Sequence, residues 1–184
     1  MLWIIFLVII VIGFIAISSF NSLVGLKNKV SEASSDIDVQ LKRRYDLIPN
    51  LVETVKGSSK FEAETLERVI QARNQAMSTT GLGADKTAAE NQLTGALRQV
   101  FDLSENYPEL KSNASYLQLQ NELTNTEDRI LSARRFYNQV VSDYNTKQET
   151  FPGMFFKGMA GSSKAQFFEL ENPAEERKNV AVKF

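Results

Sequence analysis

The most chemically distinctive stretch of the sequence is KRRYDLIPNLVETVKG, residues 42–57. Two adjacent arginines, Arg43 and Arg44, precede a proline, Pro49, within a segment whose apolar residues fall at helical spacing. Guanidinium groups suit carboxylates and phosphates, so an anionic partner is one interpretation, and a solvated helix face is the default. Proline inside a helix costs ~3 kcal/mol, so Pro49 predicts a hinge, a binding site or a packing feature.

A second polar pattern repeats at seven residues, as Tyr137-Asn138 and Tyr144-Asn145. Seven residues return to the same helix face after two turns. The pattern predicts either a polar pocket that holds a ligand or a polar seam that fixes helix register, as buried asparagine does in coiled coils. We favour the seam, because no other reactive group accompanies it.

The composition excludes several classes of function. The chain has no histidine and no cysteine, which removes imidazole bases, thiol nucleophiles and thiolate or imidazole metal ligands. No paired acids share a core-facing stripe, as they do in the metal sites of helical bundles. The formal net charge of −1 gives no field-driven affinity for nucleic acid. We therefore expect no enzyme, no catalytic residue, no cofactor, no metal, no nucleic-acid partner and no identifiable small-molecule substrate.

The sequence begins with an uncharged apolar run, LWIIFLVIIVIGFIAISSF, residues 2–20. A helix needs about 20 apolar residues to cross a bilayer. Nothing basic precedes the run and its one cleavage-like triplet is 16–18, so we expect a membrane anchor more than a cleaved signal. Lysines and arginines follow the run, which predicts a cytoplasmic main domain. The proposed anchor side chains include Leu2, Trp3, Phe6, Phe14 and Phe20.

Apolar residues then recur every three or four positions, which predicts four amphipathic helices. The first continues from the anchor to Val55, and Gly57 ends it; Ser59 and Glu62 match a capping box for the second. The second runs to about Met77, the third stops at Pro108 and the fourth begins near Asn113. We predict an all-α fold: a transmembrane helix (1–20), an elongated antiparallel bundle of two long and two short helices (21–148) and an aromatic C-terminal tail (149–184).

Equal lengths of the two long helices would return the end of the fourth helix to the bilayer. This places the segment FPGMFF beside the headgroups, where aromatic rings are favoured. We expect that the tail packs near the membrane or on a neighbouring subunit, and folding over its own bundle is the alternative. The proposed contact residues are Phe151, Pro152, Met154, Phe155 and Phe156.

Three blocks, RRYDLIPNLVETVKG, ARRFYNQVVSDYNTKQETFPG and VAVKF, resemble the signature blocks of the LemA family, and residues 20–44 fit its first soluble helix. The resemblance covers nearly the whole chain, with Phe20-Asn21 departing from the usual Tyr-Asn. It implies a bacterial inner-membrane protein with an N-terminal anchor and a helical bundle, and no enzymatic activity. Some relatives are associated with membrane remodelling, including internal compartments. Its structural signature comprises Arg43, Arg44, Asp46, Pro49, Asn50, Arg134, Arg135, Tyr137, Asn138, Tyr144 and Asn145.

Antiparallel counting supplies two contact predictions. Arg134 or Arg135 should pair with Asp36 or Asp38. Because Pro49 lacks an N–H, the carbonyl of Tyr45 needs another donor. That donor should be water or one of three polar residues of the fourth helix: Asn121, Thr124 and Asn125.

The favoured function is a membrane-anchored scaffold that self-associates and organises or remodels the membrane. The alternative is an accessory subunit that docks another membrane protein, such as a protease or a sensor. A closed homo-oligomer is expected, because the membrane-proximal stripe, which includes Leu23, Val140, Val141 and Tyr144, extends past the short helices and should need a neighbour to cover it.

Overall fold

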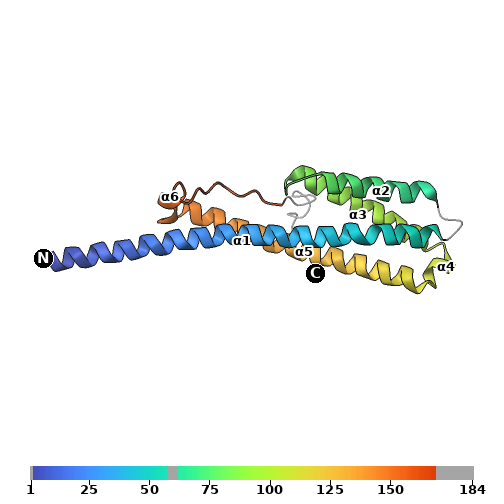
Figure 1. Cartoon of the computed structure of the whole chain (residues 1–184), viewed down its shortest axis with the longest axis horizontal. Coiled ribbons are helices and arrows are strands. Elements are labelled where there is room, and N and C mark those ends of the chain that lie inside the picture. The colour runs from blue at the N-terminus through green and yellow to red at the C-terminus, as the bar shows by residue number, and fades with distance from the viewer. Residues whose placement is uncertain (1, 58–61, 169–184) are drawn as a thin grey trace, which may run out of the picture. The chain divides into compact units, whose positions relative to one another are not determined.

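The computed structural model describes residues 2–57 and 62–168, and its elements are all helices (Figure 1). They are α1 (Leu2–Lys56), α2 (Ala63–Ser78), α3 (Ala84–Ser104), α4 (Pro108–Lys111), α5 (Ala114–Glu149) and α6 (Gly153–Phe156). No strand occurs in these residues, so the all-α prediction is confirmed. Ser59 and Phe61, two residues of the expected second-helix start, and the VAVKF block lie outside the described residues.

Helix α1 is a single 55-residue helix that includes Pro49, so the predicted continuity between the apolar segment and the following helix is confirmed. Its first part is apolar all round and long enough to cross a membrane. Its later part follows the predicted stripe, and the stripe is buried at Ala33, Ile37, Leu41 and Ile48. One helix therefore changes from a uniformly apolar surface to an amphipathic one without an intervening turn.

The chain divides into two compact units, and α1 and α5 contribute to both. The first comprises residues 1–36 and 133–167. Its α1 residue Leu23 and its α5 residues Val140, Val141 and Tyr144 are buried within the single chain. The expectation that this stripe needs a neighbouring subunit to cover it is therefore wrong. The described tail accounts for part of the cover, because α5 side chains bind its backbone between positions 163 and 166.

The second unit includes residues 37–132, with the later part of α1, all of α2, α3 and α4, and the first part of α5. Helices α2 and α3 pack against each other (Figure 1). Aliphatic side chains from the four longer segments are fully or almost fully buried, among them Ile48, Val69, Leu93 and Leu123. These are predicted stripe positions, so the core of this unit follows the helical periodicity of the sequence.

Two local details differ from expectation. Helix α3 ends at Ser104, before the expected stop at Pro108, and the Ser104 hydroxyl accepts a hydrogen bond from the phenol of Tyr116 at 2.6 Å. Pro108 then opens the short α4 instead of only ending a helix, because proline is well suited to a first helical position.

Among the described residues, no ion pair involves Asp36 or Asp38, so their expected pairing with Arg134 or Arg135 is wrong.

Candidate functional site

The most unusual site in the second unit is a buried ionic cluster centred on Arg44. The Arg44 side chain is 1% exposed, and its guanidinium forms ion pairs with Glu90 of α3 and Glu127 of α5. It also donates to the Thr94 hydroxyl of α3 at 3.0 Å. The interpretation of Arg44 as part of a solvated face is wrong, whereas Arg43 is exposed. Arg44 therefore connects three helices through one planar group.

Tyr45 and Lys86 complete the cluster. The Tyr45 phenol donates to Glu90 and accepts from the Lys86 ammonium at 3.0 Å. Lys86 also pairs with Glu90 at 3.2 Å and donates to the Ala76 carbonyl of α2 at 2.6 Å. Each oxygen of the fully buried Glu90 carboxylate thus has a cationic partner. This matters because a buried charge is costly unless it is paired and hydrogen-bonded.

The charges of the cluster balance when Tyr45 keeps its proton. Arg44 and Lys86 supply two positive charges, and Glu90 and Glu127 supply two negative ones. Burial, and then the hydrogen bond to Glu90, raise the pKa of the Tyr45 phenol well above its ordinary value, and the nearby Arg44 only partly opposes this. The phenol is therefore neutral and acts as a donor at ordinary pH.

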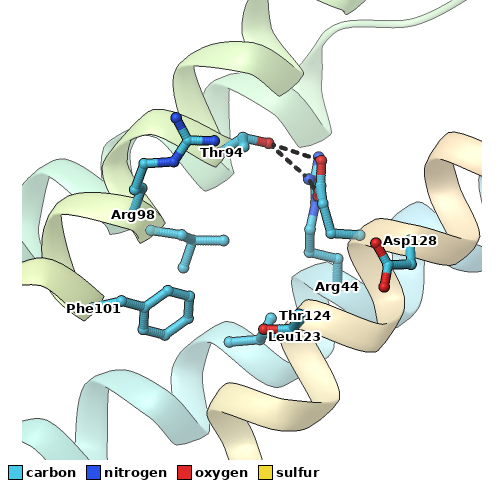
Figure 2. Close-up of a pocket in the computed structure, with 9 residues that line it drawn as sticks. Arg44, Thr94, Arg98, Phe101, Leu123, Thr124 and Asp128 are labelled. Carbon is cyan, nitrogen blue, oxygen red and sulfur yellow. Dashed lines mark hydrogen bonds and ion pairs between the residues drawn. The ribbon is translucent and has the colours of Figure 1, made fainter.

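A cavity of about 260 Å³ opens beside Arg44 (Figure 2). Arg98 and Phe101 of α3 and Asp128 of α5 line it together with Arg44. In Figure 2, Arg44 and Thr94 face one another across its inner side and are joined by a hydrogen bond. Within the described residues, the Arg44 Nε atom is buried and has no hydrogen-bond partner.

The cluster is better suited to holding helices together than to catalysis or metal binding. A general base must reach the proton that it removes, but Glu90 has no exposed surface and both its oxygens are occupied. In the described part of the chain, no group of three acidic, histidine or cysteine side chains could hold a metal ion. The cluster does join side chains of α1, α3 and α5 to the backbone of α2.

A second contact resolves the question that Pro49 raises. The Tyr45 carbonyl, which Pro49 leaves without its helical donor, accepts a hydrogen bond from Arg73 Nε of α2 at 2.8 Å. The expected donors Asn121, Thr124 and Asn125 are all exposed on α5. The prediction of an α5 donor is therefore wrong, because the donor is Arg73 of α2.

The repeated tyrosine–asparagine pattern binds the chain's own tail in the first unit. The Asn145 amide donates to the Ala165 carbonyl and accepts from the Ala165 N–H, both at 3.0 Å. The Tyr137 hydroxyl donates to the Gln166 carbonyl at 2.9 Å. These contacts match neither a ligand pocket nor a helix–helix seam: part of the repeat fixes the register of the returning backbone instead. Tyr144 is buried, and Asn138 is half-buried.

The remaining predicted residues lie at separate places. The anchor residues Leu2, Trp3, Phe6 and Phe14 are exposed, and Phe20 is half-buried. Asp46, Pro49, Asn50 and Arg135 are exposed, and Arg134 is half-buried. Of the tail residues, Phe151, Met154 and Phe155 are exposed, while Pro152 and Phe156 are half-buried.

Sequence reasoning missed Lys86, Glu90, Glu127 and Arg73. A signal was present for two of them: Glu90 precedes Leu93 by three positions and Leu97 by seven, and Lys86 precedes Glu90 by four. This spacing puts both charged residues on the apolar face of α3. A charged pair on a core-facing stripe predicts a buried partner of opposite charge.

Comparison with known proteins gives one family. The family model described as "LemA family" matches residues 33–184. A Protein LemA of Metamycoplasma hominis is 31% identical over 144 aligned residues, which cover 75% of this chain and 63% of that protein. This chain thus spans less than two thirds of that relative's length.

More distant similarity links the chain to magnetosome proteins. Magnetosome protein MamQ 2 of Paramagnetospirillum magneticum is 23% identical, covering 89% of this chain and 70% of that protein. Magnetosome protein MamQ of Magnetospirillum gryphiswaldense is 21% identical, covering 84% and 66%. None of these names denotes an enzymatic activity.

Proposed function

The chain belongs to the LemA family, and we propose that it is a non-catalytic scaffold, anchored in the bacterial inner membrane by residues 2–20, that self-associates and organises or remodels that membrane. The alternative role is an adaptor that docks another membrane protein. Similarity to the magnetosome proteins supports a function connected with membranes.

The observation that carries the proposal is the continuity of α1. Its apolar segment is almost entirely exposed in the single chain, and the same helix runs on into the buried stripe. Between residues 20 and 30 there is no break that would let a soluble domain turn freely on its anchor. An anchor of this kind imposes the orientation of the rest of α1 relative to the bilayer, which suits a scaffold.

The buried cluster supports a structural role for the second unit. Its charged groups pair with one another, and Arg44 alone contacts both α3 and α5. Such a network specifies one arrangement of helices more than it adds stability. A cytoplasmic location for this unit is proposed from the lysines that follow the anchor, beginning with Lys27.

The mass of the purified full chain in detergent tests self-association. A homogeneous homo-oligomer is expected, and a monomeric particle would favour the adaptor. Vesicles reconstituted with the protein should change in shape or size in proportion to the bound protein. If the protein is an oligomer but leaves the vesicles unchanged, the scaffold role is supported and the remodelling activity is refuted.

A further inference from the structure

An apolar hollow lies between the tail and the first part of α1. Its volume is about 270 Å³, and it is lined by apolar residues of α1 and of the segment around α6. We call residues 151–156 the wedge. The lining residues are Ile12, Ile15, Ala16, Phe151, Pro152, Phe155 and Phe156.

The wedge presents large apolar side chains outward. Phe151 and Phe155 are 77% and 66% exposed, and their rings meet edge to face with centroids 6.0 Å apart. Met154 is also exposed. Phe151 and Phe155 line the hollow together with Ile12 and Ile15, so the apolar surface of the wedge adjoins that of α1. Exposed apolar surface of this extent usually marks a contact with a membrane or a partner.

The position of the wedge is constrained at two places. Within it, the backbone of Gly153 lies so close to Lys147 that a Cβ added there would come 2.0 Å from the Lys147 carbonyl oxygen. Beyond it, the Lys27 ammonium donates to the carbonyls of Ala160 and Gly161 at 3.3 and 3.2 Å. The exposed phenylalanines therefore occupy a fixed position beside α1.

The helix rise gives the depth of that position. If Val11 marks the centre of the apolar run 2–20, Ile12 and Ala16 lie roughly 2–8 Å from the bilayer midplane. Half of the hydrocarbon layer is about 15 Å thick. Lys27 lies about 24 Å from the midplane, which is beyond the hydrocarbon. The hollow is thus at the depth of the acyl chains, and the Lys27 contacts are at the level of the headgroups.

We propose that the wedge inserts among the acyl chains of the leaflet that faces the main body of the protein, so that α1 crosses both leaflets and the wedge occupies only one. This rests on the anchor in the proposed function and deepens it, because added volume in a single leaflet favours curvature. Lys157 is exposed next to the wedge, and its long side chain can extend from that depth toward anionic headgroups at the interface. The acid Glu149 on its other side is paired with Lys164.

A single tryptophan makes the insertion measurable. The chain contains one tryptophan, Trp3, so Trp3→Phe gives a background into which Phe155→Trp or Phe151→Trp places one reporter. The matched control is Phe136→Trp, because Phe136 is 54% exposed on α5 and lies about 20 Å, by helix rise, before the end of that helix at Glu149, where the wedge follows. All three positions are exposed, so the substitutions should leave the helix content unchanged by circular dichroism.

The full-length variants are reconstituted into phosphatidylcholine vesicles that contain phosphatidylglycerol, with lipids brominated at defined acyl depths. Phe155→Trp and Phe151→Trp should emit at short wavelength and lose most of their fluorescence to brominated lipids, and iodide in the water should have little effect. Phe136→Trp should show the opposite response. Iodide quenching at both wedge positions would overturn the proposal.

The remaining outcomes separate the wedge from the anchor. Reporters that neither quencher reaches would mean that a second copy of the chain covers the wedge, which also overturns insertion. Flotation of the vesicles shows whether the anchor holds. If the protein floats with the vesicles but brominated lipids do not quench the wedge reporters, the insertion of the wedge is refuted and the anchor is retained. If the protein does not float, both the insertion and the anchor are refuted.

Discussion

Arg73 donates its Nε hydrogen to the backbone carbonyl of Tyr45 across 2.8 Å, from a different helix. Four residues after Tyr45 stands Pro49, which cannot supply the N–H that a helix would normally provide. The side chain from α2 thus takes the place of a missing backbone donor. Pro49 in this chain is a packing feature that directs α2 onto α1.

This relationship predicts an energetic coupling between the two positions. Arg73→Met keeps the aliphatic stem but leaves the carbonyl without its donor, and should lower the free energy of unfolding by ~1–3 kcal/mol. In a Pro49→Ala background the restored N–H can bond to the carbonyl, so the same substitution should cost about 1 kcal/mol less. Thermal unfolding of the full chain in detergent, followed by circular dichroism, measures both.

Arg68→Met is the control for this cycle, because Arg68 lies on α2 with a half-exposed side chain whose contacts, an ion pair with Glu64 at 3.4 Å and a hydrogen bond to Gln99 at 3.5 Å, are exposed and do not involve Tyr45. Its cost should be small and identical in both backgrounds. An equal cost of Arg73→Met in the two backgrounds would contradict the assignment of Arg73 as the substitute donor.

The adjacent arginines should differ sharply in their effect on stability. Arg44→Ala leaves Glu90 buried without its guanidinium partner and should cost ~3–5 kcal/mol. Arg43→Ala removes an exposed side chain and should change stability by less than about 0.5 kcal/mol. The same melting experiment compares them, and similar losses for the two variants would refute the structural role of the cluster.

The buried phenol of Tyr45 predicts a dependence on alkaline pH. Its pKa is raised in the folded chain, so the folded state holds the proton more tightly than the unfolded state. The contribution is fully present below the unfolded pKa of about 10 and is lost as pH rises above it. The free energy of unfolding should fall there by up to ~1.4 kcal/mol per pH unit from this group.

Tyr45→Phe isolates this contribution. The stability difference between the parent chain and the variant should be constant from neutral pH to about pH 9 and should shrink above pH 10. Chemical unfolding across this range measures the difference. A difference that stays constant to high pH would mean that Tyr45 titrates normally.

The sequence predicted the helices well because their signal is local. Three- and four-residue spacing placed Ile37, Leu41 and Ile48 on one face, and all are buried. The sequence has no cluster of helix-breaking residues just after residue 20, which predicted the continuity of α1 that the structure confirms. Helix ends were less certain, as at Ser104, because a local turn decides them.

Partners of individual side chains were not predictable in the same way. The sequence favoured a solvated face for Arg44, because the carboxylates on which its burial depends are 46 and 83 positions away in sequence. Counting along antiparallel helices gave the wrong donor for Tyr45 because it ignored α2. The role of Asn145 was missed because its partner is backbone in an irregular segment, which has no periodicity.

The Asn145 contact predicts local control of the tail. Asn145→Ala removes two hydrogen bonds to Ala165, worth together ~1–3 kcal/mol, and should raise the open population of this segment about tenfold. Limited trypsin digestion at Lys164 should then accelerate by a similar factor, while helix content is unchanged. Thr146→Ala, at the exposed next position, is the control. Equal cleavage of both variants would show that the amide does not hold the tail.

Two glycines near the wedge should respond oppositely to the same substitution. A Cβ at Gly153 would lie 2.0 Å from the Lys147 carbonyl oxygen, a backbone atom that cannot swing away, whereas a Cβ at Gly158 would meet nothing within 4 Å. Gly153→Ala should therefore displace the short helix α6, and Gly158→Ala should be tolerated.

Hydrogen exchange on the full chain in detergent distinguishes the two. The Met154 amide, which donates to the Thr150 carbonyl at 3.0 Å, should lose its protection in Gly153→Ala. The amides of the buried α5 residues Val140 and Val141 should exchange as in the parent chain, because the rest of α5 keeps its packing. Unchanged protection at Met154, or equal loss in both alanine variants, would mean that the close approach at Gly153 does not fix the wedge.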